Sequence, residues 1–442
     1  MFKPQNKIII VDDVQYDLDR LSKAFYDNGI GCKTFKYDSF ETPKLENIRV
    51  AFFDININPS GGSSDSQICN SVATAIEQYI SFQNGPFALI FWTSKPEMIE
   101  KIKAYIQRKT GQFPKPFLIN HLSKDEVNAE NLTEKLTTVL NDETLKLLFS
   151  FEEDVAVAAN KTIDQIYNII PKDIKWGENQ IFKKNFEQIF SKIAISTLGF
   201  EHAKENPEKA INEALLPIHN YILLNTSKNN ITWKSFLKSI NRKGLKYPNT
   251  FEESKLNSIF HIEKTLGIDK EKEIRGSVIK IDKTSSRKLK IIGIKNLENW
   301  INKIVPFKSD KNPDVQKNID KTKAHVHSGL ELIAVELSAA CDYSQRKERI
   351  NKYVLGIIIP KIDVKKFIDK ESRAESSYHV GGCNFNYDGV EFQLWLNLNF
   401  VVGTTSNDKK LGDVKFVLKK EIMDMIGNKY AGHISRIGIT SF

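Results

Sequence analysis

Five short apolar runs lie in the first third of the chain, and turn-forming residues separate them. Runs of this length, rich in β-branched and aromatic side chains, are typical of strands that are buried on both faces of a parallel sheet. Apolar residues at helical spacing lie between several of the runs, so strands and helices alternate. This alternation predicts a doubly wound α/β domain with a five-stranded parallel sheet. The predicted strands are residues 7–11, 31–36, 48–53, 87–92 and 116–120.

Charged and polar residues stand where these predicted strands end. Asp12 and Asp13 close the first strand, Asp54 follows the third, Thr93 follows the fourth, and Lys124 comes a few residues after the fifth. Because the carboxyl ends of parallel strands meet at one edge of the sheet, we expect these side chains to gather there. Three carboxylates repel one another unless a cation lies among them, and their hard oxygen ligands suit Mg²⁺. The lysine and the hydroxyl could bind the oxygens of a phosphoryl group attached to one carboxylate.

In these features the first third of the chain resembles the receiver domain of the response regulators of two-component signalling. The resemblance implies a flavodoxin-like fold and Mg²⁺ as a cofactor held by Asp12, Asp13 and Asp54. It also implies that Asp54 accepts phosphate from a partner histidine kinase, while Thr93 and Lys124 contact the phosphoryl oxygens. No dedicated enzymatic activity is predicted beyond this autophosphorylation.

Two features depart from the usual receiver pattern. The loop after Asp54 reads "DININPSGGSSDSQ", which is longer than usual and rich in glycine and serine. Lys124 is followed by Asp125 and Glu126 instead of proline, and these carboxylates could compete for the lysine. The departures leave a second interpretation open, in which an inactive receiver serves only as a docking scaffold.

The rest of the chain divides by pattern into two further regions, so the predicted domains are residues 1–140, 141–270 and 271–442. The middle region has apolar residues at three- and four-residue spacings, which predicts a helical connector or dimerisation region and a homodimer as one assembly. The last region has several short strand-like runs, which predict a β-rich α+β output module with a curled antiparallel sheet or small barrel. Within it, the polar residues 307–324 are expected to form an excursion or loop, and a last helix to end near Arg436.

Two short groups in the last region contain residues capable of chemistry. The segment "VELSAACDYSQRKER" includes Cys341 and Asp342, and "AGHISRIGI" includes His433 and Arg436. Both groups resemble a little-described C-terminal domain that accompanies receiver-like domains in bacterial proteins. The resemblance implies a role in bacterial stress responses or phage defence, with a histidine kinase or a kinase-like ATPase as the partner.

These groups permit more than one interpretation. A thiolate with a base and an orienting acid could make a cysteine-dependent hydrolase from Cys341, His433 and Asp342. The structural alternative is favoured: Cys341 ends a strand as a small buried residue, while Asp342 caps the turn and pairs with Arg436. A zinc site is a third interpretation, although its candidates lack the compact spacing of known zinc motifs. Those candidates are His325, His327, Cys341, His379 and Cys383.

Charge and composition exclude several classes of protein. The net charge is +9, yet the first 150 residues carry 17 Lys and Arg against 19 Asp and Glu, so the excess positive charge lies later in the chain. This charge permits nucleic-acid binding, but no helix-turn-helix with a basic recognition face is evident, and a lysine-rich solvated surface is favoured. No apolar run approaches the roughly 20 residues needed to span a bilayer, and no secretory signal pattern occurs, which predicts a cytoplasmic protein. The four scattered cysteines are expected to be reduced thiols.

Overall fold

A computed structural model provides the structure of the chain. It describes residues 7–38, 44–57, 64–109, 113–127, 130–170, 177, 179–226, 230–237, 253–263, 272–281, 293–338, 350–408 and 411–435. The chain forms two compact units, one of Met1–Asp164 with His219–Lys243 and the other of Gln165–Ile218 with Gly244–Phe442. The three domains predicted from the sequence, residues 1–140, 141–270 and 271–442, divide the chain by type of secondary structure. This division into domains stays a prediction.

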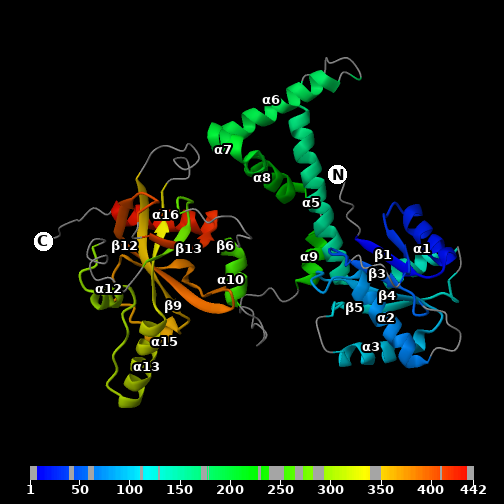
Figure 1. The fold of residues 1–442 in the computed structure, drawn as a ribbon, viewed down its shortest axis with the longest axis horizontal. Coiled ribbons are helices and arrows are strands. Elements are labelled where there is room, and N and C mark those ends of the chain that lie inside the picture. The colour runs from blue at the N-terminus through cyan, green and yellow to red at the C-terminus, as the bar shows by residue number, and fades with distance from the viewer. Residues whose placement is uncertain are drawn as a thin grey trace. The chain divides into compact units, whose positions relative to one another are not determined.

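The first unit is built on a five-stranded sheet in which every pairing is parallel (Figure 1). The strand order β2-β1-β3-β4-β5 is the flavodoxin-like order of doubly wound proteins. Along each central strand, successive apolar side chains point to opposite faces, and helices cover both faces, which explains the continuous apolar runs. The predicted α/β domain is therefore confirmed. Its strands are β1 (Ile8–Asp12), β2 (Lys33–Lys36), β3 (Val50–Phe53), β4 (Ala88–Thr93) and β5 (Leu118–Ser123).

The helices of this unit lie in two layers. Helices α1 (Gln15–Asp27) and α4 (Leu132–Val139) pack against one face of the sheet, which presents Ile10 and Phe52. Helices α2 (Asp65–Tyr79) and α3 (Ile99–Arg108) cover the opposite face, and the short turn η1 (Pro96–Met98) precedes α3. Between β2 and β3 the described residues contain no helix, and Leu45 there forms an isolated bridge with Ile80.

A long helix, α5 (Glu143–Tyr167), follows the first sheet. Near its start, Leu145 is buried in the same apolar core as α1 and α4. About two turns later, the Glu152 carboxylate lies 2.5 Å from Lys7 Nζ and 2.7 Å from Arg49 Nε. Since Lys7 and Arg49 directly precede β1 and β3, this ionic contact fastens α5 to the amino-terminal edge of the sheet.

The middle of the chain is helical, as predicted. Three phenylalanine rings, Phe182, Phe186 and Phe190, are stacked along one helix with centroids 5.6 and 4.5 Å apart. The buried core of this region consists of small residues, Ala194, Ala203 and Ala210. The helices are α6 (Asn179–Leu198), α7 (Phe200–Glu205), α8 (Pro207–Thr226) and α9 (Asn230–Phe236).

The second unit contains an antiparallel sheet with the strand order β10-β12-β9-β8-β7-β13-β6, and β11 pairs with β12. Apolar cores lie on both of its faces, with α12 (Leu297–Ile304) contributing to one and α16 (Lys420–Ile434) to the other. The predicted β-rich module with a curled antiparallel sheet is therefore confirmed. Its strands are β6 (Ile262–Glu263), β7 (Ser277–Ile281), β8 (Glu331–Glu336), β9 (Asn351–Pro360), β10 (Ser377–His379), β11 (Phe385–Tyr387), β12 (Val390–Thr404) and β13 (Leu411–Leu418). Two further short elements are η2 (Val380–Gly382) and α15 (Val364–Phe367).

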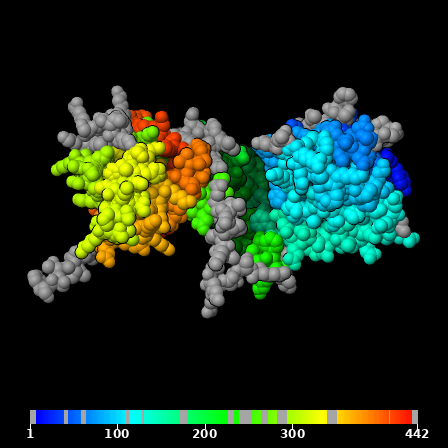
Figure 2. Space-filling view, turned by 90° about the horizontal axis from the view of Figure 1, so that it is seen from below, coloured from blue at the N-terminus to red at the C-terminus, as the bar shows by residue number. Residues whose placement is uncertain are grey.

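The expectation of a loop or excursion at residues 307–324 is wrong for most of this segment. Most of this segment belongs to helix α13 (Pro313–Gly329), whose yellow residues form part of the outer surface in Figure 2. The Asn312 side chain caps the helix by accepting a hydrogen bond from Asp314 N at 3.0 Å, and proline occupies the first helical position. Only Ile319 and Val326 are buried, so the apolar stripe is too sparse to reveal the helix by periodicity.

Strand β12 contains a large irregularity. Its pairing with β9 passes from Leu396 opposite Gly356 to Val401 opposite Val354, so β12 has extra residues in this interval. A bulge of this kind bends the strand and redirects its side chains.

Helix α10 (Glu253–His261) buries polar residues on its inner face. Ser254 Oγ donates a hydrogen bond to Glu391 Oε1 at 2.6 Å, and Ser258 Oγ accepts one from the backbone nitrogen of Asn386 at 2.7 Å. The large apolar side chains of this helix are exposed instead, namely Leu256, Ile259 and Phe260.

Within the described ranges, every helix is too short or too polar to cross a membrane.

Candidate functional site

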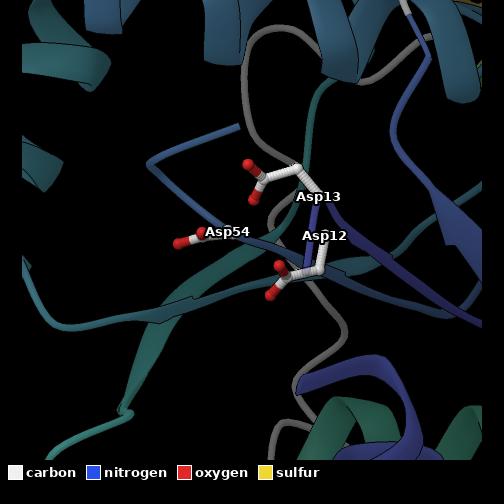
Figure 3. A group of neighbouring side chains, drawn as sticks. All are labelled: Asp12, Asp13 and Asp54. Carbon is white, nitrogen blue, oxygen red and sulfur yellow. The ribbon is translucent and has the colours of Figure 1, made fainter. Parts of the chain in front are cut away.

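Three carboxylates gather at the carboxyl edge of the first sheet (Figure 3). Asp12 is the last residue of β1, Asp13 follows it, and Asp54 follows β3, which lies beside β1. Each of the three offers an oxygen, and these oxygens lie within 4.8 Å of one another. Asp12 and Asp54 are 0% and 3% exposed, whereas Asp13 is half-buried. The structure thus brings together the acidic residues that the strand ends predicted.

Lys124, directly after β5, reaches into this cluster. Its Nζ lies 2.7 Å from Asp12 Oδ2, 2.8 Å from Asp17 Oδ2 and 3.2 Å from Asp54 Oδ2. The backbone nitrogen of Lys124 donates to the carbonyl of Thr93 at 3.1 Å, which ties the end of β5 to the end of β4. A single ammonium group therefore contacts three of the carboxylates at this edge.

The neighbours of Lys124 do not compete for it in the way that the sequence suggested. Asp125 accepts a hydrogen bond from Ser94 Oγ at 2.9 Å, and Glu126 lies 3.6 Å from Lys135 Nζ. Neither carboxylate forms an ion pair with Lys124 among the described residues.

Thr93 ends β4 and is fully buried. Its Oγ1 accepts a hydrogen bond from the backbone nitrogen of Lys95 at 3.0 Å, which holds the chain as it turns out of the sheet. The hydroxyl is thus placed at the same sheet edge as the carboxylates, between the ends of β3 and β5.

Sequence reasoning missed Asp17. This residue lies in the first turn of α1, and it meets the cluster because Lys124 extends to it from β5. An aspartate in a first helical turn is usually explained by the favourable interaction with the helix dipole, so its type and position gave no signal of a contact more than a hundred residues away.

Two cations lie near the aromatic ring of Trp92. The Arg20 guanidinium is 5.3 Å from the ring centroid, and Lys124 Nζ is 6.0 Å from it. Arg20 also donates a hydrogen bond to the carbonyl of Val127, close after Lys124. Because Trp92 is fully buried, the packing around it fixes its ring beside the Lys124 ammonium group.

Burial and mutual repulsion shape the ionisation of the cluster. Burial raises the pKa of Asp54, and Lys124 only partly offsets this effect. Burial also raises the pKa of Asp12, against the hydrogen bonds from Lys124 and Val14, and burial and the charge of Asp12 raise the pKa of Asp13. Burial alone would lower the pKa of Lys124, but the charges and hydrogen bonds of the surrounding carboxylates outweigh it and raise that pKa.

The residues of the cluster fit a divalent metal ion. Asp54 Oδ1 is buried and has no hydrogen-bond partner in the described part of the chain. An unsatisfied buried carboxylate oxygen is costly, and a cation would relieve that cost. The three carboxylates offer only oxygen ligands, which is the set that Mg²⁺ prefers. Asp12, Asp13 and Asp54 are accordingly the residues that would hold it.

Of the four C-terminal candidate residues, only His433 lies within the described residues. Cys341, Asp342 and Arg436 lie outside the described residues. His433 lies on α16, and its Nε2 is 2.7 Å from Asn399 Oδ1 in the bulge of β12. The cysteine-dependent hydrolase and the pairing of Asp342 with Arg436 therefore stay predictions.

The candidate zinc ligands do not gather among the described residues. His379 Nε2 lies 3.2 Å from the backbone oxygen of Cys383, and its ring stacks on Trp395 with the centroids 4.3 Å apart. His325 and His327 lie on α13. Within the described ranges, the only group of three or more such side chains close enough to hold a metal ion is the acidic cluster of the first unit.

Comparison with known proteins gives the following result. No protein-family model matches the chain. No curated protein matches it. The strand order of the first sheet itself identifies the doubly wound fold of the first unit.

Several solved structures are similar to part of the chain. Chemotaxis protein CheY4 of Vibrio cholerae is 19% identical with a TM-score of 0.21, over 31% of this chain and 100% of that chain. A response regulator receiver domain protein of Clostridium thermocellum is 20% identical with a TM-score of 0.21, over 32% of this chain and 98% of that chain. FixJ of B. japonicum is 12% identical with a TM-score of 0.22, over 54% of this chain and 100% of that chain.

Proposed function

We propose that the first unit is a receiver whose Asp54 accepts a phosphoryl group from a partner histidine kinase and thereby controls the C-terminal module. The observation that carries the proposal is the buried Asp54 carboxylate, one oxygen of which has no partner among the described residues, beside Asp12, Asp13 and the Lys124 ammonium. This arrangement combines an acceptor, ligands for a cation and a donor for phosphoryl oxygens at one sheet edge.

The proposed transfer is a displacement at phosphorus. A carboxylate oxygen of Asp54 attacks the phosphorus of the kinase's phosphohistidine, so a P–O bond forms as the P–N bond breaks. The histidine nitrogen leaves with the bonding electron pair and takes up a proton. Mg²⁺, when bound, supplies charge neutralisation for the phosphoryl oxygens. Lys124, held 3.2 Å from Asp54 Oδ2, donates to a phosphoryl oxygen, and the Thr93 hydroxyl is the second donor.

Mass measurement of the intact protein tests this proposal. The full chain is incubated with acetyl phosphate and Mg²⁺, and wild type is compared with Asp54→Asn. We expect wild type to gain about 80 Da, one phosphoryl group, and the variant to gain nothing. Asp65→Asn is the matched control, because Asp65 is an exposed aspartate of α2 that pairs with Lys101. Equal masses for wild type and Asp54→Asn would reject the proposal.

A second function follows from the contacts of Lys124. Because this one ammonium group already contacts three carboxylates, part of the cluster's charge is neutralised without a metal ion. This contact supports the alternative of an inactive receiver that acts as a docking scaffold. The alternative predicts that wild type neither binds Mg²⁺ nor gains mass, and that Asp54→Asn retains the function of the protein in the cell.

The cellular setting that we propose is the bacterial cytoplasm, with a histidine kinase or kinase-like ATPase as the partner and a stress response or phage defence as the role. A homodimer through the helical middle is part of the same proposal. Light scattering with and without acetyl phosphate would measure the oligomeric state, and a monomer under both conditions would exclude the homodimer.

A further inference from the structure

Lys124 contacts two residues of the proposed site, Asp12 and Asp54, and also Asp17, which has no part in the proposed transfer. A lysine ammonium has three N–H donors. In this structure it lies within 3.2 Å of three carboxylates, those of Asp12, Asp17 and Asp54. Asp17 lies closer to it than Asp54 does, at 2.8 Å against 3.2 Å.

Asp17 differs from the other carboxylates in its origin. It belongs to helix α1, whereas Asp12 and Asp54 stand at strand ends. Within the described residues it is not a member of the group that could hold a metal ion, which consists of Asp12, Asp13 and Asp54. Its side chain is 16% exposed and that of Lys124 is 14% exposed, so water screens their attraction only partly.

We propose that Asp17 is a positioning residue that competes with Asp54 for Lys124 and so limits how well the cluster binds a phosphoryl group. The inference rests on the proposed function and adds a residue that tunes it. When a phosphoryl group is attached to Asp54, its oxygens need the ammonium as a donor, and Lys124 must give up its contact with Asp17 to serve them fully. The attraction between Asp17 and Lys124 therefore makes the phosphorylated state less favourable.

The inference predicts opposite effects on a cation and on an anion. Removal of the Asp17 charge makes the edge less negative and lets Lys124 shift toward Asp12 and Asp54, so Mg²⁺ should bind more weakly. The same change frees Lys124 for phosphoryl oxygens and reduces repulsion of an anion, so phosphorylation should become more favourable. A loss of local structure would instead weaken both kinds of binding.

The experiment compares full-length wild type with Asp17→Asn. Mg²⁺ alone is titrated by calorimetry, and beryllofluoride is then titrated in saturating Mg²⁺ as a mimic of the phosphoryl group. For Asp17→Asn we expect Mg²⁺ binding weaker by about threefold to tenfold and beryllofluoride binding tighter by a similar factor, the size of one partly screened charge interaction. Circular dichroism establishes that the variant is folded.

Two further variants separate position from charge. Asp19→Asn removes the same charge from the same helix, but Asp19 is exposed and contacts Gln15, so both affinities should stay near those of wild type. Asp17→Glu keeps the charge, and both affinities should return toward those of wild type.

The outcomes distinguish this inference from the proposed function. If wild type gains a phosphoryl group but Asp17→Asn behaves like Asp19→Asn, or if both affinities fall together, the role of Asp17 is wrong and the receiver function stands. If wild type binds neither Mg²⁺ nor beryllofluoride, the proposed function fails and this inference fails with it.

Discussion

The ammonium group of Lys124 lies 2.7 Å from the carboxylate of Asp12, a side chain that is fully buried. The contact joins the end of β5 to the end of β1, two strands that are not neighbours in the sheet. The other oxygen of Asp12 accepts a hydrogen bond from Val14 N at 2.8 Å. The buried charge of Asp12 is therefore stabilised by one lysine and one backbone amide.

Replacement of Lys124 by glutamine should destabilise the first unit in the absence of metal. Lys124→Gln leaves buried carboxylates without their cation, and such a loss costs about 3 kcal/mol in the free energy of unfolding. Urea unfolding followed by circular dichroism, in EDTA and then in Mg²⁺, measures the effect. We expect Mg²⁺ to stabilise the variant more than wild type, because the ion replaces the missing positive charge.

The matched control for this variant is Lys135→Gln. Lys135 is 45% exposed and lies 3.6 Å from Glu126, so its loss should change stability little. Equal stability of Lys124→Gln and Lys135→Gln in EDTA would contradict the importance assigned to the buried contact.

The ion pair that fastens α5 should make stability depend on pH. Burial acts to raise the pKa of Glu152, but the hydrogen bonds from Lys7 and Arg49 outweigh it, and the net shift is downward from 4.5. A lowered pKa in the folded state stabilises the fold above the unfolded value, and the contribution is lost as the pH falls through the folded value. Glu152→Gln should therefore lower the free energy of unfolding by about 1 kcal/mol at neutral pH. As the pH falls below about 4.5, the variant should lose less stability than wild type does. Urea unfolding across this pH range, with the exposed neighbour Glu153→Gln as control, is the measurement.

His379 should titrate far below an ordinary histidine. Burial lowers its pKa to about 4, and the charge of Arg373 acts in the same direction. Because the folded pKa is depressed, the neutral ring stabilises the fold above pH 6.5, and this contribution is lost as the pH falls from 6.5 toward 4. The variant His379→Phe keeps an aromatic ring against Trp395 and should not lose this part of its stability.

Proton NMR provides the direct check on His379. Its ring signal, identified by its disappearance in His379→Phe, should shift with a midpoint near pH 4. A midpoint at 6.5 would show that the ring is open to water, in conflict with its stack on Trp395.

Glycine is required at position 356 by the close approach of two strands. A Cβ there would lie 2.3 Å from Trp395 O and 2.7 Å from Leu396 Cδ2, beside the bulge of β12. Because the first of these atoms belongs to the backbone, Gly356→Ala should cost at least about 3 kcal/mol. Gly432→Ala is the control, since a Cβ there meets nothing within 4 Å and alanine favours helix α16. Thermal unfolding of the full chain should separate the two, and similar midpoints would contradict the predicted clash.

The sequence predicted the parts of the structure that depend on local patterns. The apolar runs of β1, β3 and β4 were clearest because these strands are buried along their whole length, and a strand buried on both faces must be apolar throughout. The gathering of Asp12, Asp13 and Asp54 followed from the rule that parallel strands end at one edge.

Contacts over long distances in sequence were not predictable from such patterns. Asp17 meets Lys124 only because α1 and the end of β5 lie together, and no periodicity encodes that meeting. His433 likewise meets Asn399 only because β12 is bulged between Leu396 and Val401.

Helix α13 was missed for a different reason. Its stability depends on the Asn312 cap and the leading proline instead of a wide apolar stripe. An Asn-Pro pair before a polar segment is also typical of turns, so the same letters permit a loop.

Helix α10 is attached to the second sheet largely through hydroxyl groups with carboxylate or amide partners, while the ring of His261 lies against that of Phe385. Its separation from the sheet would mainly exchange protein hydrogen bonds for hydrogen bonds to water and would uncover little apolar surface. The heat capacity of the molecule would then change little, unlike in the unfolding of a sheet with two buried faces. The attachment of this helix should accordingly withstand cooling that weakens hydrophobic packing elsewhere in the chain.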